Sequence, residues 1–299
     1  MTARLAQPHV ALATCAALPE LDNDEQLVIA PLEARGVRVM VAVWDDPAVD
    51  WAQYDLVVIR STWDYTARRD AFVEWARRVP RLANPADIVA WNTDKHYLAD
   101  LASAGVTVVP TAWLEPGDTV ELPSSGRHVV KPAVGAGSVD AATYELDDAA
   151  PAAAARAHAE RVLGGGQAVL VQPYLSAIDA HGETGLIFLH GRFSHAVGKS
   201  AMLGGDEREE IAGLYKAETI ESRTPTAAEM ALAEHVLGVV PGGATRLTYA
   251  RVDLVPADDG TPLLIELELT EPSLFMATAP GSAERLADAI VATLGLTRD

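Results

Sequence analysis

The stretch LLIELELTEPSLF, from Leu263 to Phe275, places two glutamates two residues apart in an otherwise apolar run. Alternation of this kind predicts a half-buried β-strand, because successive side chains of a strand point to opposite faces. Glu266 and Glu268 then share one face, and the opposite face carries the apolar residues Ile265, Leu267 and Leu269.

The segment just before it, TYARVDLVPADDGTPLL, predicts a second strand that ends in an Asp-Gly hairpin turn. If the pair 259–260 forms the turn, Asp253 lies opposite Glu266 in the two paired strands. The same register places Arg251 opposite Glu268.

Three carboxylates therefore come together on one face of the predicted hairpin. Opposed acids on adjacent strands cost about 0.2 to 1 kcal/mol unless a positive charge lies between them. Magnesium would remove that cost, since it is a hard ion held by one or two carboxylates together with substrate phosphates. The alternative is a solvated polar face, which is normal in antiparallel sheets. The hairpin alone leaves both interpretations open.

Composition narrows the classes of function. The chain has 299 residues, enough for two or three compact units, and a formal charge of −19. That charge argues against nucleic acid and against an anionic membrane surface as partners, because both bind clustered Lys and Arg. We find no apolar run long enough to span a bilayer and no signal-peptide pattern, so we expect a cytoplasmic protein.

Lysine is scarce, with four residues against 19 arginines: Lys95, Lys131, Lys199 and Lys216. A lysine ammonium acts on phosphates as a compact, mobile point charge, and arginine replaces it poorly in a nucleotide site. The few lysines are therefore candidates for phosphate binding. The alternative is that four basic residues happen to be lysine and are solvated.

The first part of the chain alternates short apolar strands with helical stretches, including a helix over 24–36, and this rhythm predicts a parallel sheet. Ligands of such sheets lie beyond the carboxyl ends of the strands. The third strand leads into RSTWDY at 60–65, next to a helix N-terminus, where a carboxylate could bind. A helix-capping loop is the alternative.

The middle of the chain predicts a helix from about Asn92 to Gly105 with Lys95 in its first turn, then a strand interrupted by Pro110. Two strands flank the glycine loop AVGAGS, whose backbone amides can approach a phosphate. Further on we expect a strand in AVLVQPYL, a hairpin in GLIFLHGRFSHAVGKSA with its turn at 190–191, and an acidic loop over 203–213.

Over roughly residues 90 to 275, the order and spacing of six features resemble those of the ATP-grasp superfamily of ligases. The features are the lysine before GVTVVPT, the lysine before the glycine loop, VLVQPYL, GRFSHAVGKS, ARVDLV and LIELEL. The resemblance implies a mixed α/β and α+β fold with ATP held between two lobes. It implies three domains: an N-terminal βαβ (pre-ATP-grasp) domain at 1–104, a small lid at 105–175 and a C-terminal catalytic domain at 176–299.

The resemblance also implies roles for individual residues, with ATP and Mg²⁺ as cofactors. The implied ATP-binding residues are Lys95, Lys131 and Ser138 near the phosphates, Gln172, Pro173, Tyr174 and Leu175 around adenine, and Glu183 at the ribose. The implied catalytic residues, which face the transferred phosphoryl group, are Lys199 and Arg251. The implied magnesium ligands are Asp253, Glu266 and Glu268, the last standing where many members have asparagine.

Within the superfamily, VVIRSTWDY, WNTDKHYL and LIELELTEPSLF resemble a stand-alone branch that includes the cyclo-ligases of D-cycloserine biosynthesis, an antibiotic pathway. This implies that the carboxylate of O-ureido-D-serine is phosphorylated and then attacked by the nitrogen on its side-chain oxygen. The candidate residues for binding this small amino acid are Arg60, Thr62, Asp64 and His195.

Two alternatives remain open from the sequence. One is an ATP-grasp ligase that joins an amino-acid or peptide carboxylate to a separate amine. The other is a non-catalytic protein that binds a nucleotide or an amino acid. The family resemblance also implies a possible homodimer.

Overall fold

The computed structural model describes residues 7–200, 210–211, 214–216 and 219–295. Its N-terminal part is a parallel sheet in the order β2-β1-β3, as the strand–helix alternation predicted. The strands are β1 (His9–Thr14), β2 (Arg38–Val43) and β3 (Leu56–Ile59). The connecting segments form η1 (Trp51–Gln53), η2 (Trp63–Ala67) and α3 (Arg69–Arg78).

The helix predicted over 24–36 is divided into α1 (Asn23–Gln26) and α2 (Ile29–Ala34). Pro31 explains the division, because proline has no N–H and fits only the first turn of a helix. By restarting at Ile29, the chain places Pro31 in the first turn of α2.

The helix predicted from about Asn92 to Gly105 is shorter in the structure. Its expected start is instead the end of α4 (Ala86–Asn92), and α5 (Tyr97–Ser103) begins only after Lys95, so the predicted place of Lys95 in the first turn is wrong. The buried Asn92 side chain donates to the Leu267 carbonyl and accepts from the Leu269 N–H, so it joins this point to the neighbouring strand. Lys95 consequently lies between the two helices, and its N–H donates to the carbonyl of Ala133.

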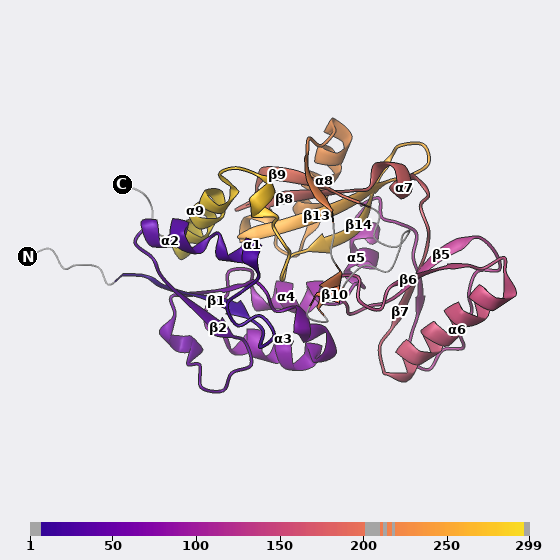
Figure 1. Ribbon diagram of the computed structural model, residues 1–299, viewed down its shortest axis with the longest axis horizontal. Helices are drawn as coiled ribbons and strands as arrows, with labels where there is room; N and C mark the ends of the chain where they lie inside the picture. Colours follow the sequence, from indigo (N-terminus) through magenta and orange to yellow (C-terminus); the bar gives the residue numbers. More distant parts are fainter. Residues whose placement is uncertain (1–6, 201–209, 212–213, 217–218, 296–299) are drawn as a thin grey trace, which may run out of the picture.

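The lid part contains an antiparallel sheet in the order β4-β7-β5-β6, covered on one face by α6 (Ala149–Gly164). Its strands are β4 (Ala112–Leu114), β5 (Arg127–Pro132), β6 (Ala142–Glu145) and β7 (Val169–Pro173). Pro110 lies at the change of sheet: Val108 bridges to Leu264, whereas β4 pairs with β7. Figure 1 shows this part at one end of the molecule, opposite the N-terminal sheet.

The largest sheet is antiparallel and has the order β12-β9-β8-β13-β14. Its strands are β8 (Glu183–Leu189), β9 (Arg192–Lys199), β12 (Ile220–Arg223), β13 (Tyr249–Pro256) and β14 (Pro262–Glu268). Around it lie α7 (Ala177–His181), α8 (Ala227–Val239) and η3 (Ala244–Arg246), with α8 packed on β13 and β14. The predicted turn of the β8–β9 hairpin is confirmed: His190 and Gly191 both have positive φ, 49° and 74°, as a type I′ turn requires.

The register of β13 on β14 is the predicted one, with Asp253 opposite Glu266 and Arg251 opposite Glu268. The predicted turn is nevertheless wrong. The Ala257 N–H donates to the Thr261 carbonyl, so three residues form the loop at 258–260.

A β-bulge beyond Asp253 restores the expected register, because β14 contributes one extra residue there, Ile265. The bulge also changes the face of that residue. Ile265 packs with Val109 and Ile178, whereas Leu267 and Leu269 enter the main core. The prediction that Ile265 shares their face is therefore wrong.

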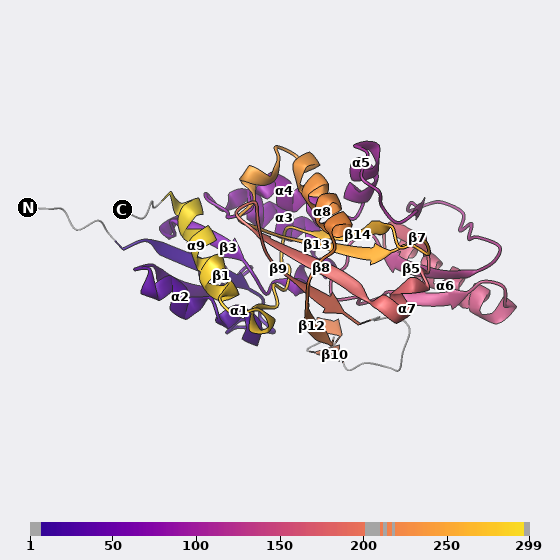
Figure 2. The same ribbon diagram turned by 90° about the horizontal axis from the view of Figure 1, so that it is seen from above.

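After η4 (Met276–Thr278), the last helix, α9 (Ser282–Leu294), returns to the N-terminal sheet. It packs on α2, and its Leu286 and Ile290 share a core with Val10 and Leu12 of β1. Figure 2 shows α9 beside β1 and α2. The domain boundaries at 104 and 175 stay predictions.

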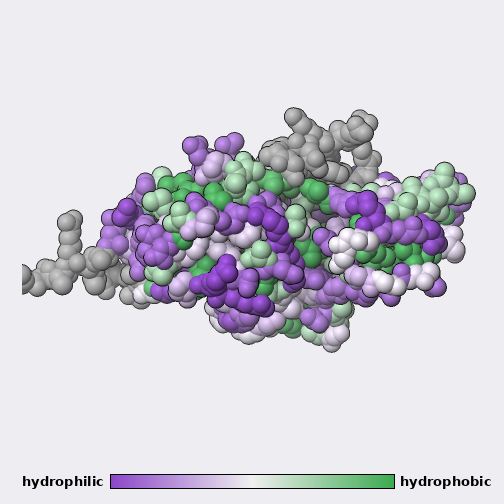
Figure 3. Space-filling model, turned by 90° about the horizontal axis from the view of Figure 1, so that it is seen from below, coloured by the Kyte–Doolittle hydropathy of each residue, from purple (hydrophilic) through white to green (hydrophobic). Residues whose placement is uncertain are grey.

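The remaining short strands are β10 (Glu210–Ile211) and β11 (Tyr215–Lys216). Of the predicted acidic loop over 203–213, only the two residues of β10 are among the described residues. Among the helices of the described residues, none has the length and apolarity to cross a bilayer. On the face shown in Figure 3, hydrophobic residues reach the surface between hydrophilic ones.

Asn84 tests how the N-terminal part is joined to the large sheet. This buried amide donates to the carbonyls of Tyr249 and Leu269 and accepts from the Thr248 N–H. Asn84→Ala leaves these backbone groups without a partner, so we expect urea unfolding to give a loss of about 2 to 4 kcal/mol. The exposed Asp258→Ala is the control, expected within about 0.5 kcal/mol of wild type. Equal stability of the two variants would contradict this role.

Candidate active site

A cavity of about 370 Å³ opens where the N-terminal part, the lid sheet and the large sheet meet. Most residues predicted for ATP, metal and catalysis line it: Lys95, Lys131, Ser138, Gln172, Pro173, Tyr174, Leu175, Glu183, Lys199, Arg251, Glu266 and Glu268. Asp253 lies just behind this wall, 1 % exposed. The cavity therefore brings together segments more than 150 residues apart in sequence, such as Lys95 and Glu266.

One end of the cavity is mainly apolar and contains the segment predicted to hold adenine. Gln172 is buried here, and its amide donates to the Thr111 hydroxyl at 2.9 Å. The neighbouring Tyr174 is covered by the Arg127 guanidinium, 3.7 Å from its ring centre. Further apolar residues complete this end: Val109, Val129, Ile178 and Ile265. A flat heterocycle fits such a lining.

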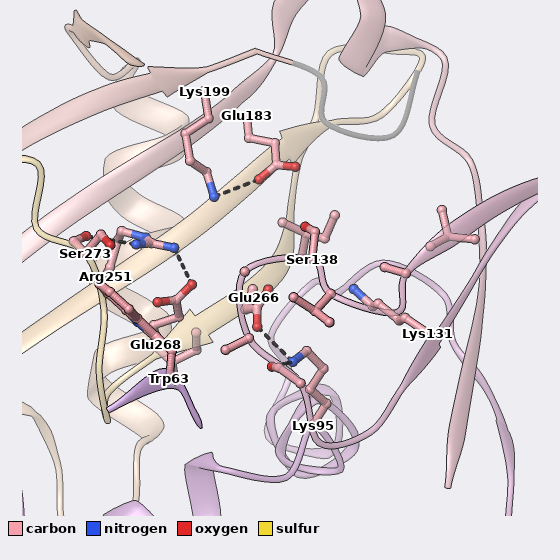
Figure 4. A pocket seen from close by; sticks show the side chains of 18 of the residues that line it. Trp63, Lys95, Lys131, Ser138, Glu183, Lys199, Arg251, Glu266, Glu268 and Ser273 are labelled. Atoms are coloured by element: carbon pink, nitrogen blue, oxygen red, sulfur yellow. Dashed lines mark hydrogen bonds and ion pairs between the residues drawn. The ribbon is translucent and has the colours of Figure 1, made fainter. Parts of the chain in front are cut away.

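The centre of the cavity is a set of alternating acids and cations (Figure 4). Lys199 Nζ lies 2.7 Å from Asp253 and 3.0 Å from Glu183. Arg251 contacts the other Asp253 oxygen at 2.9 Å and also pairs with Glu268. These contacts follow from the strand register, because β9, β8, β13 and β14 are adjacent in the sheet.

The fourth acid of this set, Glu266, pairs with a cation from outside the sheet. Lys95 Nζ lies 3.0 Å from Glu266 and donates to the Gly135 carbonyl of the glycine loop at 2.6 Å. Burial opposes ionisation of Glu266, but Lys95 and Lys131 outweigh it and lower its pKa. Lys95 thus connects the segment between α4 and α5 to two parts of the cavity: the acidic face of β14, through Glu266, and the glycine loop, through Gly135.

The two acids that share Arg251 have opposite pKa shifts. Burial disfavours the charged form of Asp253, but Arg251 and Lys199 prevail and lower its pKa to about 2. Burial raises the pKa of Glu268 to about 8; Arg251 opposes this rise, while Asp253 and Glu266 add to it. Asp253 is therefore the more acidic of the two carboxyl groups that contact Arg251.

Lys131 faces this set from the lid sheet and points toward the centre of the cavity (Figure 4). Within the described residues its ammonium group has neither a hydrogen bond nor an ion pair, unlike those of Lys95 and Lys199. Burial lowers the pKa of Lys131, with Glu266 opposing the shift and Lys95 adding to it. An anionic ligand would supply the partner that its ammonium lacks.

The glycine loop between β5 and β6 forms the roof of the cavity. Gly137, Ser138 and Asp140 all have positive φ, 58°, 56° and 58°, which turns the backbone sharply over the site. Asp140 anchors the far side of the loop through Arg161 on α6. Backbone amides in such a loop can approach a phosphate closely.

The three predicted magnesium ligands fit that ion only together with other donors. Within the described residues, no group of three or more His, Cys, Asp or Glu side chains is arranged to hold a metal by itself. Magnesium needs no such group, since one or two carboxylates, waters and nucleotide phosphates complete its octahedron. The oxygen-only chemistry of Asp253, Glu266 and Glu268 suits this arrangement.

The four residues predicted to bind the substrate do not reach the cavity wall. Arg60 is fully buried and forms a bidentate pair with Glu25, at 2.6 and 3.0 Å. Asp64 accepts from Trp44 and Arg68. Their predicted direct contact with substrate has no support in this geometry.

The other two candidates are also held away from the cavity. Thr62 is completely buried, and the His195 ring contacts the Leu274 carbonyl at 2.8 Å. Burial lowers the pKa of His195, so its neutral ring can donate to that carbonyl. The sequence showed the polar character of these residues but not the segments that cover them.

Five further residues line the cavity without having been assigned individual roles from the sequence: Trp63 and Tyr65, from the 60–65 loop where a carboxylate was expected, and Glu271, Ser273 and Phe275. The last three alternate along TEPSLF, with Thr270, Pro272 and Leu274 turned away from the cavity. This alternation was a usable signal for a cavity-facing edge. The two aromatic residues follow β3 in η2, at the sheet edge where a ligand was expected.

A nucleotide-type cavity between two antiparallel sheets, with lysines on both sides and acids on the final hairpin, defines an ATP-grasp ligase. The RimK domain ATP-grasp protein from Sphaerobacter thermophilus DSM 20745 shares the fold, with a TM-score of 0.65, 20% identity and coverage of 97% of this chain and 100% of that one. The crystal structure of D-cycloserine synthetase DcsG matches with a TM-score of 0.84 and 34% identity, over 96% of this chain and 99% of that one.

Sequence comparison gives the same relationship. The family described as D-cycloserine synthetase DcsG, N-terminal domain, matches residues 10–84. Cycloserine biosynthesis protein DcsG from Streptomyces lavendulae is 36% identical over 299 residues, which cover 95% of this chain and 98% of the relative. The chain belongs to this family of ATP-grasp ligases.

Asp253 predicts how the ligand-free protein responds to acid. Its pKa is about 2 against an ordinary 3.8, so its contribution to stability is present above the ordinary value and is lost as the pH falls toward 2. We expect wild type to lose about 1 kcal/mol more than Asp253→Asn between pH 5 and pH 3. Urea unfolding without nucleotide or magnesium measures this difference. Parallel pH curves for the two proteins would contradict the assignment.

Proposed function

We propose that this protein is an ATP-dependent cyclo-ligase that converts O-ureido-D-serine to D-cycloserine in antibiotic biosynthesis. The observation that carries the proposal is the convergence of four cations on one cavity that also has an apolar end for adenine: Lys95, Lys131, Lys199 and Arg251. Phosphoryl transfer needs positive charge and in-line positioning more than it needs a covalent protein group. The name of the Streptomyces relative supports the choice of substrate.

In the proposed reaction the substrate carboxylate attacks the γ-phosphorus of ATP, forming an acyl phosphate and releasing ADP. The nitrogen bonded to the side-chain oxygen then attacks the acyl carbon, and phosphate leaves as the five-membered ring closes. Hydrolysis of the carbamoyl group releases carbon dioxide and ammonia. Because both reacting groups belong to one molecule, the protein gains rate by holding a folded conformer and excluding water.

The residues divide this work by position. Lys131 and Lys95 neutralise ATP phosphates, while Lys199 and Arg251 stabilise the charge that develops on the transferred group. Magnesium, held by Asp253, Glu266 and Glu268, would offset the remaining negative charge of the nucleotide. Gln172–Leu175 would hold adenine, Glu183 the ribose, and Ser138 would cover the phosphates.

An intermolecular ligase that joins a carboxylate to a separate amine shares this machinery and is the second candidate. It differs in needing a second substrate before product forms. A binding protein without turnover is the third candidate. The ion pairs around Arg251 argue against it, because they hold cations where negative charge would develop on a transferred phosphoryl group, and binding a ligand without turnover does not require this. Homodimer formation, lack of nucleic-acid partners and a cytoplasmic location stay predictions.

The proposed reaction is tested by ADP release with magnesium and ATP. The panel is O-ureido-D-serine, its L isomer, D-alanine and pairs of common amino acids, with product masses recorded. ADP formed with O-ureido-D-serine alone, together with the mass of cycloserine, is the expected result. ADP only in two-substrate mixtures would favour the intermolecular ligase, and no ADP in any mixture would favour a binding protein.

Glu266 provides a test of the acidic hairpin. Glu266→Gln keeps the size of the side chain but removes the charge that pairs with Lys95 and would face magnesium. We expect substrate-dependent ADP release to fall about 100-fold or more, with folding retained by circular dichroism. The exposed Glu221→Gln on β12 is the matched control and should keep wild-type turnover. A Glu266 variant of normal rate would rule out this assignment.

A further inference from the structure

Glu271 is a buried acid of the cavity that the proposed chemistry does not use. It lines the wall with 7 % of its surface exposed. Its carboxylate is hydrogen-bonded by the Tyr65 hydroxyl, and within the described residues no Lys, Arg or His forms an ion pair with it. Burial raises the pKa of Glu271 to about 7, with Tyr65 and then Lys95 opposing the shift. The cavity thus contains an acid whose charge lacks compensation.

The carboxylate is not needed to hold its own loop. Each backbone carbonyl from 270 to 274 accepts a hydrogen bond from a side chain of another segment. The donors, in order along the loop, are Tyr249, Trp63, Arg60, Arg251 and His195. Asp24 additionally accepts from two N–H groups just beyond, at 276 and 277. The backbone is therefore fixed independently of the Glu271 carboxylate, whose hydrogen bond from Tyr65 leaves it able to accept further donors from a ligand.

The position of Glu271 complements an α-amino acid. The cations that would face the ATP phosphates lie on one side, with Arg251 reaching to the Ser273 carbonyl, two residues from Glu271. An α-amino acid carries its ammonium one carbon from its carboxylate. An ammonium bound at Glu271 would hold the carboxylate on the Arg251 side, where phosphorylation is proposed. The ammonium would also supply the compensation that the buried acid lacks.

We propose that Glu271, oriented by Tyr65, binds the α-ammonium group of the substrate and so restricts activation to α-amino acids. This inference rests on the proposed function, because it assigns one end of the substrate whose other end is phosphorylated. A competing role for the same residue is to take the proton from the attacking nitrogen. The two roles differ in what happens to a substrate without an ammonium group.

The test compares O-ureido-D-serine with its analogue in which hydrogen replaces the amino group. For wild type we expect kcat/KM to favour the amino acid by about 10- to 100-fold, the range for a hydrogen-bonded charge. In Glu271→Gln this preference should fall to within about threefold, mainly through a higher KM for the amino acid. Tyr65→Phe should reduce the preference partly. Glu221→Gln, the exposed control, should keep it.

Two outcomes would overturn the inference. One is a Glu271→Gln protein that keeps the wild-type preference for the amino acid. The other is an equal fall in kcat for both substrates with the preference unchanged, which would identify proton transfer instead. A folding defect is recognised separately: removal of an uncompensated buried charge should leave the Tm of Glu271→Gln equal to or above that of wild type.

Failure of the proposed function is distinguishable from failure of this inference. If wild type releases no ADP with any substrate, the proposed reaction is wrong. Calorimetric titration of wild type and Glu271→Gln, saturated with ADP and magnesium, then compares binding of O-ureido-D-serine with binding of the analogue. Loss of the ammonium preference in the variant would support the ammonium site without turnover, and an unchanged preference would overturn it.

Discussion

The need to compensate buried charge governs the arrangement of this molecule. An isolated carboxylate or ammonium is costly in a protein interior, and a partner of opposite sign removes most of that cost. The large sheet meets this condition by placing Lys199 on β9 in reach of Asp253 and Arg251 on β13, with β8 between the two strands. Lys95 closes the set from outside the sheet through Glu266. The relative position of helices and sheet is therefore tied to the charge balance of the cavity.

A second constraint acts on the chain just after β14. Backbone that leaves a sheet must find other partners for its carbonyl groups when it stays buried. Residues 270 to 274 find them in side chains from η2, β9 and β13 and in the buried Arg60, which directly follows β3. Arg60 looked like a ligand-binding residue in the sequence, yet it holds in place the loop that lines the cavity. Its partner Glu25 lies 35 positions away in the sequence, so no local sequence pattern predicts this ion pair.

The sequence was informative where local pattern and strand pairing determine position. The two-residue periodicity of β14 and the hairpin placed Asp253 opposite Glu266, although the turn was taken one residue short. The bulge at Ile265 compensated for that error, and no feature of the sequence marks it. The predicted helix start near Asn92 was wrong for a related reason, because the position of Asn92 at the end of α4 is fixed by tertiary hydrogen bonds of its side chain.

Lys131 and Glu271 both lack an ion-pair partner among the described residues, and their signs are opposite. Lys131 faces the centre from the lid sheet, and Glu271 lies in the loop beyond β14. If compensation governs the rest of the cavity, these two mark where ligands must supply charge: an anion at Lys131 and a cation at Glu271. A nucleotide and an amino acid bring those charges. The two unpaired charges thus indicate how the ligands lie in the cavity. The nucleotide phosphates lie toward Lys131, the ammonium group of the amino acid lies toward Glu271, and the paired charges around Arg251 lie between them.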